Sequence, residues 1–413
     1  MKGAEVVKLG IKTLDDIEFR GKVAIVRPDF NVPIDPITKV IKDDSRIRSH
    51  AKTIKELIDK GAKVVIIAHQ GRPGEPDFSE SLEEHAKRLS EILNKPVKYV
   101  HDLFGEEARR AIRELKTGEV LVLKNVRTYP YETKKLSAEE HARTEMVEIL
   151  SSLADVFILD GFSVAHRSHA SVVGFTRKLP SCMGRVMERE LEALSRIFEH
   201  PEKPCICILG GAKAEKGTKA IENLLRKKIA DKILLGGLIG QLFLVASNVD
   251  LGRPNIEFLK RKNIYECLPK AVELIKEFKE SIELPVDVAV EINGLRRELE
   301  VKELPTDYPI YDIGTKTAHK YANIVKTAKS VLVSGPLGVY EKDEFIKGTE
   351  IVFRAIAESK VFSLAGGGDT LAALKKIDLY DKFTYVSLAG GAFVEYITGS
   401  KLPGIEALKS AVT

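Results

Sequence analysis

Basic side chains follow apolar, strand-like segments in the first half of the chain. The segments that end this way read "VRPDFNVP", "AHQGRP", "LKNVRTY" and "DGFSVAHRSH". In a parallel sheet the carboxyl ends of the strands meet at one edge, so residues far apart in sequence converge there. Several guanidinium groups at one point repel one another unless an anion of high charge lies between them, and arginine suits phosphate and carboxylate. We predict a polyanion site, with unrelated surface ion pairs as the alternative; its arginines are Arg46, Arg72, Arg127 and Arg167.

Glycine replaces arginine at the corresponding positions of the second half. The strand-like segments there end in "LGGAKAEKG", "LGGLIG", "SGPLGVYE", "AGGGDT" and "LAGGA". Glycine lets the backbone approach a ligand closely and leaves amide N–H groups available for phosphate. A single Gly–Gly pair usually marks a tight turn, but the repetition predicts a nucleotide site. The chain has no G-x-x-x-x-G-K-[ST], H-R-D or D-F-G motif, which excludes P-loop and protein-kinase sites, and no dinucleotide fingerprint follows the first strand of either half.

Short apolar segments alternate with amphipathic segments along the chain. This alternation predicts the strands and helices that would position the arginine- and glycine-bearing strand ends. Continuous apolar strands such as "KVVIIAHQG", each followed by a helical pattern, indicate a parallel sheet covered on both faces. The pattern runs from residue 20 to about 175 and restarts after a long helical stretch, with "CICILGG", "DKILLGG", "VDVAVE", "SVLVSGP", "VFSLAGGG" and "TYVSLAGGA". We predict an α/β fold of two doubly wound, Rossmann-like parallel-sheet domains, joined by a hinge helix and separated by a cleft.

Length and composition agree with two globular domains. The chain has 413 residues, of which 44% are hydrophobic and 30% charged, and a net charge of +5 from 65 basic and 60 acidic residues. So small an excess indicates neither nucleic acid nor membrane as a partner, and no obligate protein partner is evident. The N-terminus lacks an apolar signal region, so we expect a cytoplasmic protein. Cys205 and Cys207 are interpreted as reduced core thiols, with a metal or redox pair as the alternative.

The ordered motifs resemble those of phosphoglycerate kinases from about Gly21 to "KLPGIEAL". The family patterns VRVDFNVP, RI, SHLGRP, ENVRF and AHRAHAS stand here as "VRPDFNVP", "RI", "AHQGRP", "KNVRT" and "AHRSHAS". GGAKV, GPMGVFE, GGGDT and STGGGA stand as "GGAKA", "GPLGVYE", "GGGDT" and "SLAGGA". The resemblance implies a two-lobed enzyme of glycolysis and gluconeogenesis. Such an enzyme transfers the acyl phosphate of 1,3-bisphosphoglycerate reversibly to MgADP, giving 3-phosphoglycerate and MgATP, by hinge closure of its lobes.

The resemblance also implies a role for individual residues. Arg46 and Lys213 would be catalytic, and Asp369 would bind Mg²⁺. The substrate would be bound by Asp29, Phe30, Asn31, Arg46, His69, Gln70, Gly71, Arg72, Arg127 and Arg167. The nucleotide would be bound by Gly210, Gly211, Lys213, Lys216, Gly236, Gly237, Pro336, Gly338, Glu341, Gly367, Gly368, Asp369 and Thr370. The implied segments are a 3-phosphoglycerate-binding domain (1–182), a hinge helix (183–199), a nucleotide-binding domain (200–395) and a tail returning to the first domain (396–413).

Some positions depart from the family patterns. The second lysine of GGAKVADK is replaced by Gly217, and Lys216 lies one residue earlier. Ser334, Lys124 and Pro28 also differ from the pattern, but the arginines predicted to bind the anion are all retained. Phosphoryl transfer to or from a carboxylate needs no general base, because a carboxylic acid with a pKa of about 4 is already ionised at neutral pH. Two competing hypotheses remain. A non-enzymatic, two-lobed polyanion-binding protein would not need a magnesium-binding aspartate, and the missing dinucleotide fingerprint counts against a dehydrogenase.

Overall fold

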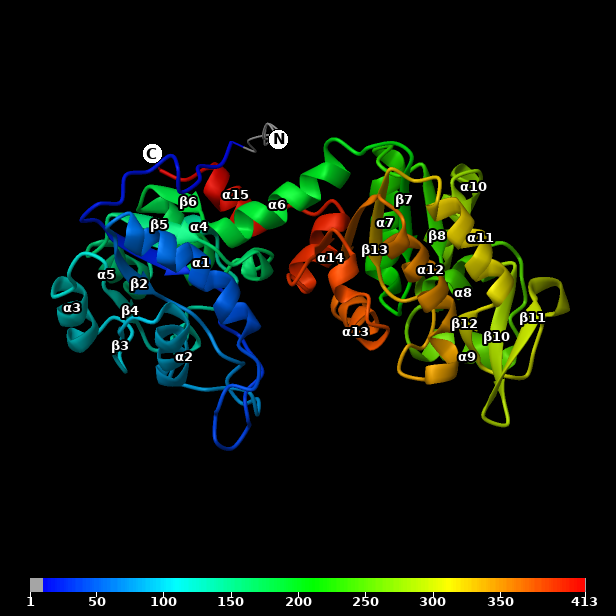
Figure 1. Ribbon diagram of the computed structural model, residues 1–413, viewed down its shortest axis with the longest axis horizontal. Helices are drawn as coiled ribbons and strands as arrows, with labels where there is room; N and C mark the ends of the chain where they lie inside the picture. Colours follow the sequence, from blue (N-terminus) through cyan, green and yellow to red (C-terminus); the bar gives the residue numbers. More distant parts are fainter. Residues whose placement is uncertain (1–9, 413) are drawn as a thin grey trace. The chain divides into compact units, whose positions relative to one another are not determined.

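The computed structural model describes residues 10–412, which form two compact units (Figure 1). Unit 1 ends at Glu192 and takes up the chain again at Lys401, whereas unit 2 runs from Ala193 to Ser400. Residues 1–9 and 413, which fall in the first and last segments predicted from the sequence, lie outside the described residues. Each unit has its own six-stranded parallel sheet, so the predicted α/β fold with two parallel-sheet domains is confirmed.

The sheet of unit 1 has the strand order β3-β4-β2-β1-β5-β6, and every pairing in it is parallel. The chain moves to one side of β1 with β2, β3 and β4 and to the other side with β5 and β6. The order therefore reverses between β1 and β5, which in open α/β sheets is where ligands bind. The strands are β1 Val23–Arg27, β2 Lys63–Ile66, β3 Val97–Tyr99, β4 Val120–Val122, β5 Val156–Leu159 and β6 Ser181–Met183.

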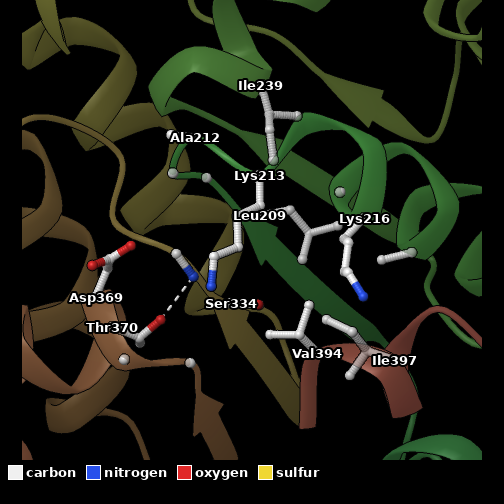
Figure 2. Close-up of a pocket in the computed structure, with 17 residues that line it drawn as sticks. Leu209, Ala212, Lys213, Lys216, Ile239, Ser334, Asp369, Thr370, Val394 and Ile397 are labelled. Atoms are coloured by element: carbon white, nitrogen blue, oxygen red, sulfur yellow. Dashed lines mark hydrogen bonds between the residues drawn. The ribbon is translucent and has the colours of Figure 1, made fainter. Parts of the chain in front are cut away.

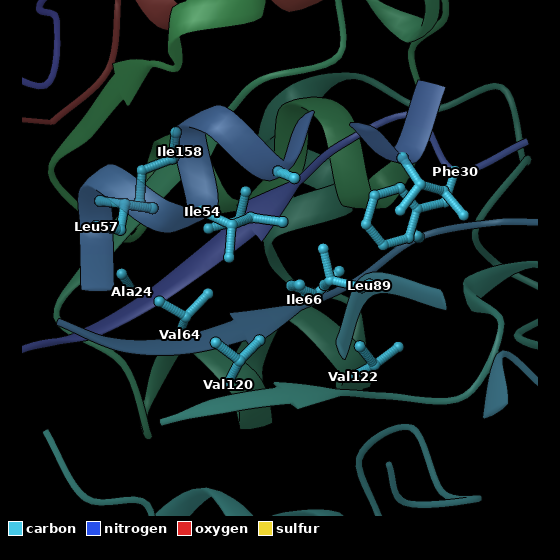
Figure 3. Close-up of a cluster of buried hydrophobic side chains, with 14 of the residues drawn as sticks. Ala24, Phe30, Ile54, Leu57, Val64, Ile66, Leu89, Val120, Val122 and Ile158 are labelled. Atoms are coloured by element: carbon cyan, nitrogen blue, oxygen red, sulfur yellow. The ribbon is translucent and has the colours of Figure 1, made fainter. Parts of the chain in front are cut away.

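Helices α1 and α2 cover one face of this sheet. Ile54 and Leu57 of α1 and Leu89 of α2 lie over Val64, Ile66 and other strand residues in one buried cluster (Figure 3). The cluster holds α1 in place, and with it the Arg46 side chain near the start of that helix. The helices of unit 1 are α1 Ser45–Asp59, α2 Glu83–Leu93, α3 Glu106–Arg113, α4 Ala138–Ala142, α5 Glu145–Ser151, the first part of α6 Arg185–Phe198, and α15 Pro403–Lys409. Short helical turns are η1 Val126–Thr128, η2 Phe162–Val164, η3 Ala170–Gly174 and η4 Phe175–Arg177.

Unit 2 has a second parallel sheet, in the order β15-β14-β13-β7-β8-β9. Its strands are β7 Cys205–Leu209, β8 Lys232–Leu235, β9 Ile282–Glu283, β13 Ser330–Ser334, β14 Phe362–Gly366 and β15 Tyr385–Val386. The helices are α7 Ala214–Arg226, α8 Gly237–Ala246, α9 Arg253–Arg261, α10 Leu268–Glu277, α11 Thr315–Val325, α12 Lys347–Glu358, α13 Gly368–Lys376 and α14 Gly391–Ile397.

The predicted sheet partners of one strand of unit 2 were wrong. The segment "VDVAVE" forms most of β10 (Asp287–Ile292), which belongs to a separate antiparallel sheet in the order β11-β10-β12 and not to the parallel sheet. The reason is the turn after it: Asn293 and Gly294 both have positive φ, as the tight turn of an antiparallel hairpin requires. The hairpin partner is β11 (Leu295–Glu300), and β12 is Ile310–Ile313.

Two segments pass between the units. Helix α6 contains the boundary between Glu192 and Ala193, and the chain returns to unit 1 at Lys401. There α15, drawn in red, packs against β6 and η3 (Figure 1). Gly404 N donates to Ala165 O at 2.8 Å, and Arg177 donates to Ser410 O at 2.7 Å. No helix among residues 10–412 has the length and apolar character needed to cross a membrane. All four cysteines are free thiols, and the three in strands are buried.

Candidate active site

The loop after β1 in unit 1 carries a buried carboxylate held by cationic and hydroxyl groups. Asp29 is 3% exposed, and its Oδ2 accepts from Arg46 at 2.8 Å and from the Ser163 hydroxyl. Arg46, on the first turn of α1, also donates to Asn31 O at 2.9 Å. Burial opposes ionisation of Asp29, but the charge of Arg46 and the hydrogen bond from Ser163 hold the pKa of this carboxyl well below its usual range. Asp29 is therefore a permanent anion that orients Arg46.

Further predicted residues fix this loop to the loop after β2. Asn31 Oδ1 accepts from Gly71 N at 2.8 Å, and Gln70 exchanges hydrogen bonds with both backbone groups of Val32. Gly71 has a φ of 66°, and a Cβ there would lie 2.4 Å from Asp77 O, so only glycine fits. Phe30 and Gln70 are fully buried. They support the loops from beneath.

Several arginines lie close enough to perturb one another's ionisation. Burial, together with Arg167 and Arg27, lowers the pKa of Arg127 to about 10. Burial and Arg72 likewise lower the pKa of Arg167. Arg127 Nε is buried without a hydrogen-bond partner among residues 10–412. At neutral pH these groups are all charged, so unit 1 holds a concentration of positive charge that an anion would stabilise.

Beneath this cluster, one buried carboxylate supplies counter-charge. Glu132 accepts from Ser171 N at 2.9 Å and from its hydroxyl at 2.5 Å, and Ser171 in turn accepts from Arg27 Nε at 2.8 Å. Burial raises the pKa of Glu132, and Arg27 opposes that change. Arg27 is only 1% exposed. Arg27 ends β1, within the segment "VRPDFNVP", and no role was predicted for it from the sequence.

The histidine at the end of "KVVIIAH" has a defined proton position. Arg27 lies with its terminal nitrogen 3.0 Å from His69 Nδ1. A guanidinium group can only donate, so Nδ1 accepts and the proton resides on Nε2. Burial and Arg27 hold the pKa of His69 well below its usual range. His69 is therefore a neutral side chain with one N–H group to offer a ligand.

In unit 2, the candidate nucleotide residues line a hollow of about 490 Å³, including its space open to solvent (Figure 2). Helices α7 and α13 begin at this hollow, and no side chain caps the N-terminus of either helix within the described part of the chain. Their first N–H groups and partial positive charge suit a phosphate chain. Thr370 accepts from Gly335 N at 2.7 Å, which ties α13 to the loop after β13. The predicted residues in the lining are Gly210, Gly211, Lys213, Lys216, Gly367, Gly368, Asp369 and Thr370.

The two lysines of the hollow point in different directions. Figure 2 shows the Lys213 side chain extending toward Asp369 and Thr370, whereas Lys216 extends toward α14. Lys216 forms an ion pair with Glu395 of α14. At the position where a second lysine was expected, a Cβ on Gly217 would lie 2.3 Å from Cδ1 of Ile239. The close packing of α7 on α8 therefore excludes a larger residue there unless Ile239 moves. Lys216, one residue earlier, lines the hollow together with Lys213.

Five predicted nucleotide residues are not in the lining. Gly237 N donates to Leu337 O at 2.8 Å, and a Cβ on Gly236 would contact Leu337. The remaining three lie in the loop after β13: Pro336 O accepts from Gly211 N at 2.8 Å, Gly338 packs against Asp312, and the Glu341 side chain is exposed. The glycines and Pro336 therefore shape the loops of the hollow through the backbone.

Asp369 is suited to a divalent cation. It lies in the first turn of α13, is exposed, and lines the hollow. Tyr340 Oη donates to Asp369 Oδ1 over a long distance of 3.4 Å. An accessible carboxylate beside the uncapped N–H groups of α13 fits Mg²⁺, which is usually held by one or two carboxylates and substrate phosphates.

Sequence reasoning missed four contributors that carry no motif signal. Ser163, Glu132 and Ser171 act through contacts between segments more than thirty residues apart. Glu395 lies on a helix whose pairing with α7 is a tertiary contact. Only the family pattern around each residue, compared across relatives, would have indicated them.

Comparison with known proteins gives a consistent result. The family model described as "Phosphoglycerate kinase" matches residues 14–400. The chain is 44% identical to a phosphoglycerate kinase of Methanothermus fervidus over 97% of each chain, and 46% identical to one of Methanopyrus kandleri over 96% of this chain and 97% of the relative. The crystal structure of a phosphoglycerate kinase from Pyrococcus horikoshii OT3 has a TM-score of 0.85 and 42% identity, with 96% of this chain and 98% of that chain covered.

Proposed function

The chain belongs to the phosphoglycerate kinase family, and from this we propose that unit 1 binds the three-carbon acid while unit 2 binds the nucleotide. The family reaction is reversible phosphoryl transfer between 1,3-bisphosphoglycerate and ADP. Membership in the family makes the chain a phosphotransferase and decides against the dehydrogenase and the non-enzymatic binding protein. We propose the cytoplasm as the location, because the nucleotide pool and the metabolites of this reaction are there.

The burial of Arg127, whose Nε has no hydrogen-bond partner among residues 10–412 and whose positive neighbours are Arg167 and Arg27, is the observation that carries the role of unit 1. Buried guanidinium groups that repel one another are stabilised when an anion enters between them. Arg72, Arg127 and Arg167 would bind the phosphate that is not transferred, and His69 would donate its Nε2–H. Asn31 and Asp29 would bind the glycerate end, which sets the orientation of the acid.

Unit 2 would bind the nucleotide through N–H groups and lysines. The first turns of α7 and α13 would contact the phosphates, and Lys213 and Lys216 would neutralise their charge. Glu341 would contact the ribose. Asp369 would hold Mg²⁺, which when bound neutralises phosphate oxygens and keeps them in register.

Transfer needs alignment and charge neutralisation more than proton chemistry. The acceptor is a phosphate oxygen in one direction and a carboxylate in the other, and both are ionised at neutral pH. Arg46 and Lys213 would therefore act on the charge of the passing phosphoryl group. Because the two ligands bind to different units, the reaction requires a closed state in which they meet and from which water is excluded.

A coupled assay tests the proposal. Purified protein with 3-phosphoglycerate and MgATP should form 1,3-bisphosphoglycerate, measured by its reduction with glyceraldehyde-3-phosphate dehydrogenase and NADH. Omission of Mg²⁺ should abolish the signal. Binding of 3-phosphoglycerate without MgATP-dependent turnover would overturn the proposal and support a non-enzymatic binding protein.

A further inference from the structure

A buried histidine lies beneath the loop that carries Asp29 and Asn31. His50 lies on α1 one turn after Arg46 and is 3% exposed. Its Nε2 is 3.1 Å from the backbone nitrogen of Asp29, and its Nδ1 is 2.6 Å from Asp160 Oδ2. The imidazole ring therefore joins the acid-binding loop to a second carboxylate.

The hydrogen bonds at the two ring nitrogens determine the tautomer. A backbone N–H group can only donate, so Nε2 of His50 must accept from Asp29. The ring proton is then on Nδ1 and is donated to Asp160. Both ends of the ring are satisfied by this one tautomer. The reversed tautomer would place two N–H groups face to face.

Asp160 is a fixed anchor for this ring. It lies directly after β5 and is fully buried. Its Oδ1 accepts from the Thr53 hydroxyl at 2.8 Å and from Val186 N, in the first turn of α6, at 3.0 Å. A Cβ on Gly184 would lie 2.0 Å from the same oxygen, so the chain packs tightly around it.

The loop that His50 holds carries more than one ligand-facing group. Asn31 N donates to Asp29 Oδ1 at 2.9 Å, and Arg46 donates to both Asp29 and Asn31. A displacement of the Asp29 backbone would therefore also move the acceptors that orient Arg46. The position of the Asp29 amide therefore affects Asp29, Asn31 and Arg46 together.

We propose that His50 is a positioning residue of the acid site, which holds the Asp29 amide in place by linking it to the carboxylate anchored at α6. It acts through the loop and does not touch the ligand. The inference rests on the proposed roles of Asp29 and Asn31 in binding the three-carbon acid.

Two substitutions separate the two ends of the link. His50→Asn retains a donor where Nδ1 lies, toward Asp160, but is too short to accept from Asp29. His50→Gln places an amide oxygen near the Nε2 position, so it can accept from Asp29. A buried N–H group that loses its partner is left desolvated and unsatisfied, so His50→Asn should raise the KM for 3-phosphoglycerate by about tenfold. His50→Gln keeps an acceptor for the Asp29 amide but loses the hydrogen bond to Asp160, so its KM should lie between those of wild type and His50→Asn, about threefold above the wild-type value. The KM for ATP should not change in either variant.

Thermal unfolding and a matched control exclude a general loss of structure. Thr176 is fully buried in unit 1 and its hydroxyl donates to Val173 O, away from the loop. Thr176→Val should lower Tm while leaving the KM for 3-phosphoglycerate unchanged. Equal KM values for His50→Asn and His50→Gln, or a wild-type KM for His50→Asn, would overturn the inference.

Asp29→Asn separates this inference from the proposed function. If Asp29→Asn leaves the KM for 3-phosphoglycerate unchanged, the assignment of the acid site is wrong. If it raises that KM and His50→Asn does not, only the role of His50 fails. Nitrogen-15 NMR of histidine-labelled wild-type protein, with the His50 signal identified by its loss in the Gln variant, should show Nδ1–H. An Nε2–H tautomer would overturn the inference even if His50→Asn did not fold.

Discussion

Glu395→Gln should tighten nucleotide binding. In the structure, Lys216 is paired with Glu395, although it lines the hollow proposed for the phosphates. A phosphate that recruits Lys216 must compete with this carboxylate. The two side chains are 41% and 28% exposed, so solvent screens the pair and it contributes about 0.2–1 kcal/mol. Removing the competitor should lower the Kd for MgADP by about 1.4- to 5-fold.

Titration calorimetry at low and high salt measures this effect. The gain should shrink at high ionic strength, because salt screens the ion pair. Glu215→Gln is the matched control: Glu215 lies on α7, the helix that carries Lys216, but its ion pair is with Lys219. It should change the Kd for MgADP less than Glu395→Gln does.

A double-mutant cycle supplies the decisive comparison. In a Lys216→Met background, Glu395→Gln should no longer tighten binding, because the pair is already absent. If the gain persists there, Glu395 acts by repelling the phosphates and the competition for Lys216 is refuted. An unchanged Kd for MgADP in the single variant Glu395→Gln would refute it as well.

Three further outcomes are expected. Arg46→Ala and Lys213→Ala should each lower kcat by about 10²- to 10³-fold, with smaller changes in KM, since both would act on transition-state charge; an unchanged kcat in the coupled assay removes the assignment. Asp369→Asn should raise the Mg²⁺ concentration for half-maximal activity but not change Tm without nucleotide; equal Mg²⁺ dependence contradicts its role. Burial lowers the pKa of His85 to about 4 from 6.5, so unfolded protein binds the proton first as pH falls. This one group should then lower the free energy of unfolding by about 1.4 kcal/mol per pH unit between pH 6 and 4. Urea titrations measure that free energy, and the same drop in His85→Gln as in wild type would contradict the role of His85.

The sequence patterns predicted the parallel sheets because that signal is local. A continuous apolar strand followed by an amphipathic helix indicates a covered parallel sheet wherever it occurs, and "KVVIIAHQG" forms β2 as predicted. "VDVAVE" has a similar apolar composition, but its place in an antiparallel sheet depends on the Asn293–Gly294 turn and on pairing with β12. Apolar content alone does not distinguish these environments.

Candidate ligand groups were predictable where the residue type itself restricts the chemistry. Clustered arginines suit only anions, and repeated glycines at strand ends leave N–H groups accessible. The supporting groups were not predictable in this way. Glu132, Ser163 and His50 are ordinary residues in their segments, and their importance comes from partners brought near by folding.

The amino-acid sequence by itself determined the family, the two parallel sheets and the types of group proposed to bind the ligands, since these depend on local order and side-chain chemistry. Only the tertiary structure decided the charge states and orientations in the site: Asp29 ionised by its neighbours, His69 neutral beside Arg27, and Lys216 paired with Glu395. The physical reason is that ionisation and hydrogen bonding in a buried site depend on distances between atoms, which the order of residues along the chain does not state.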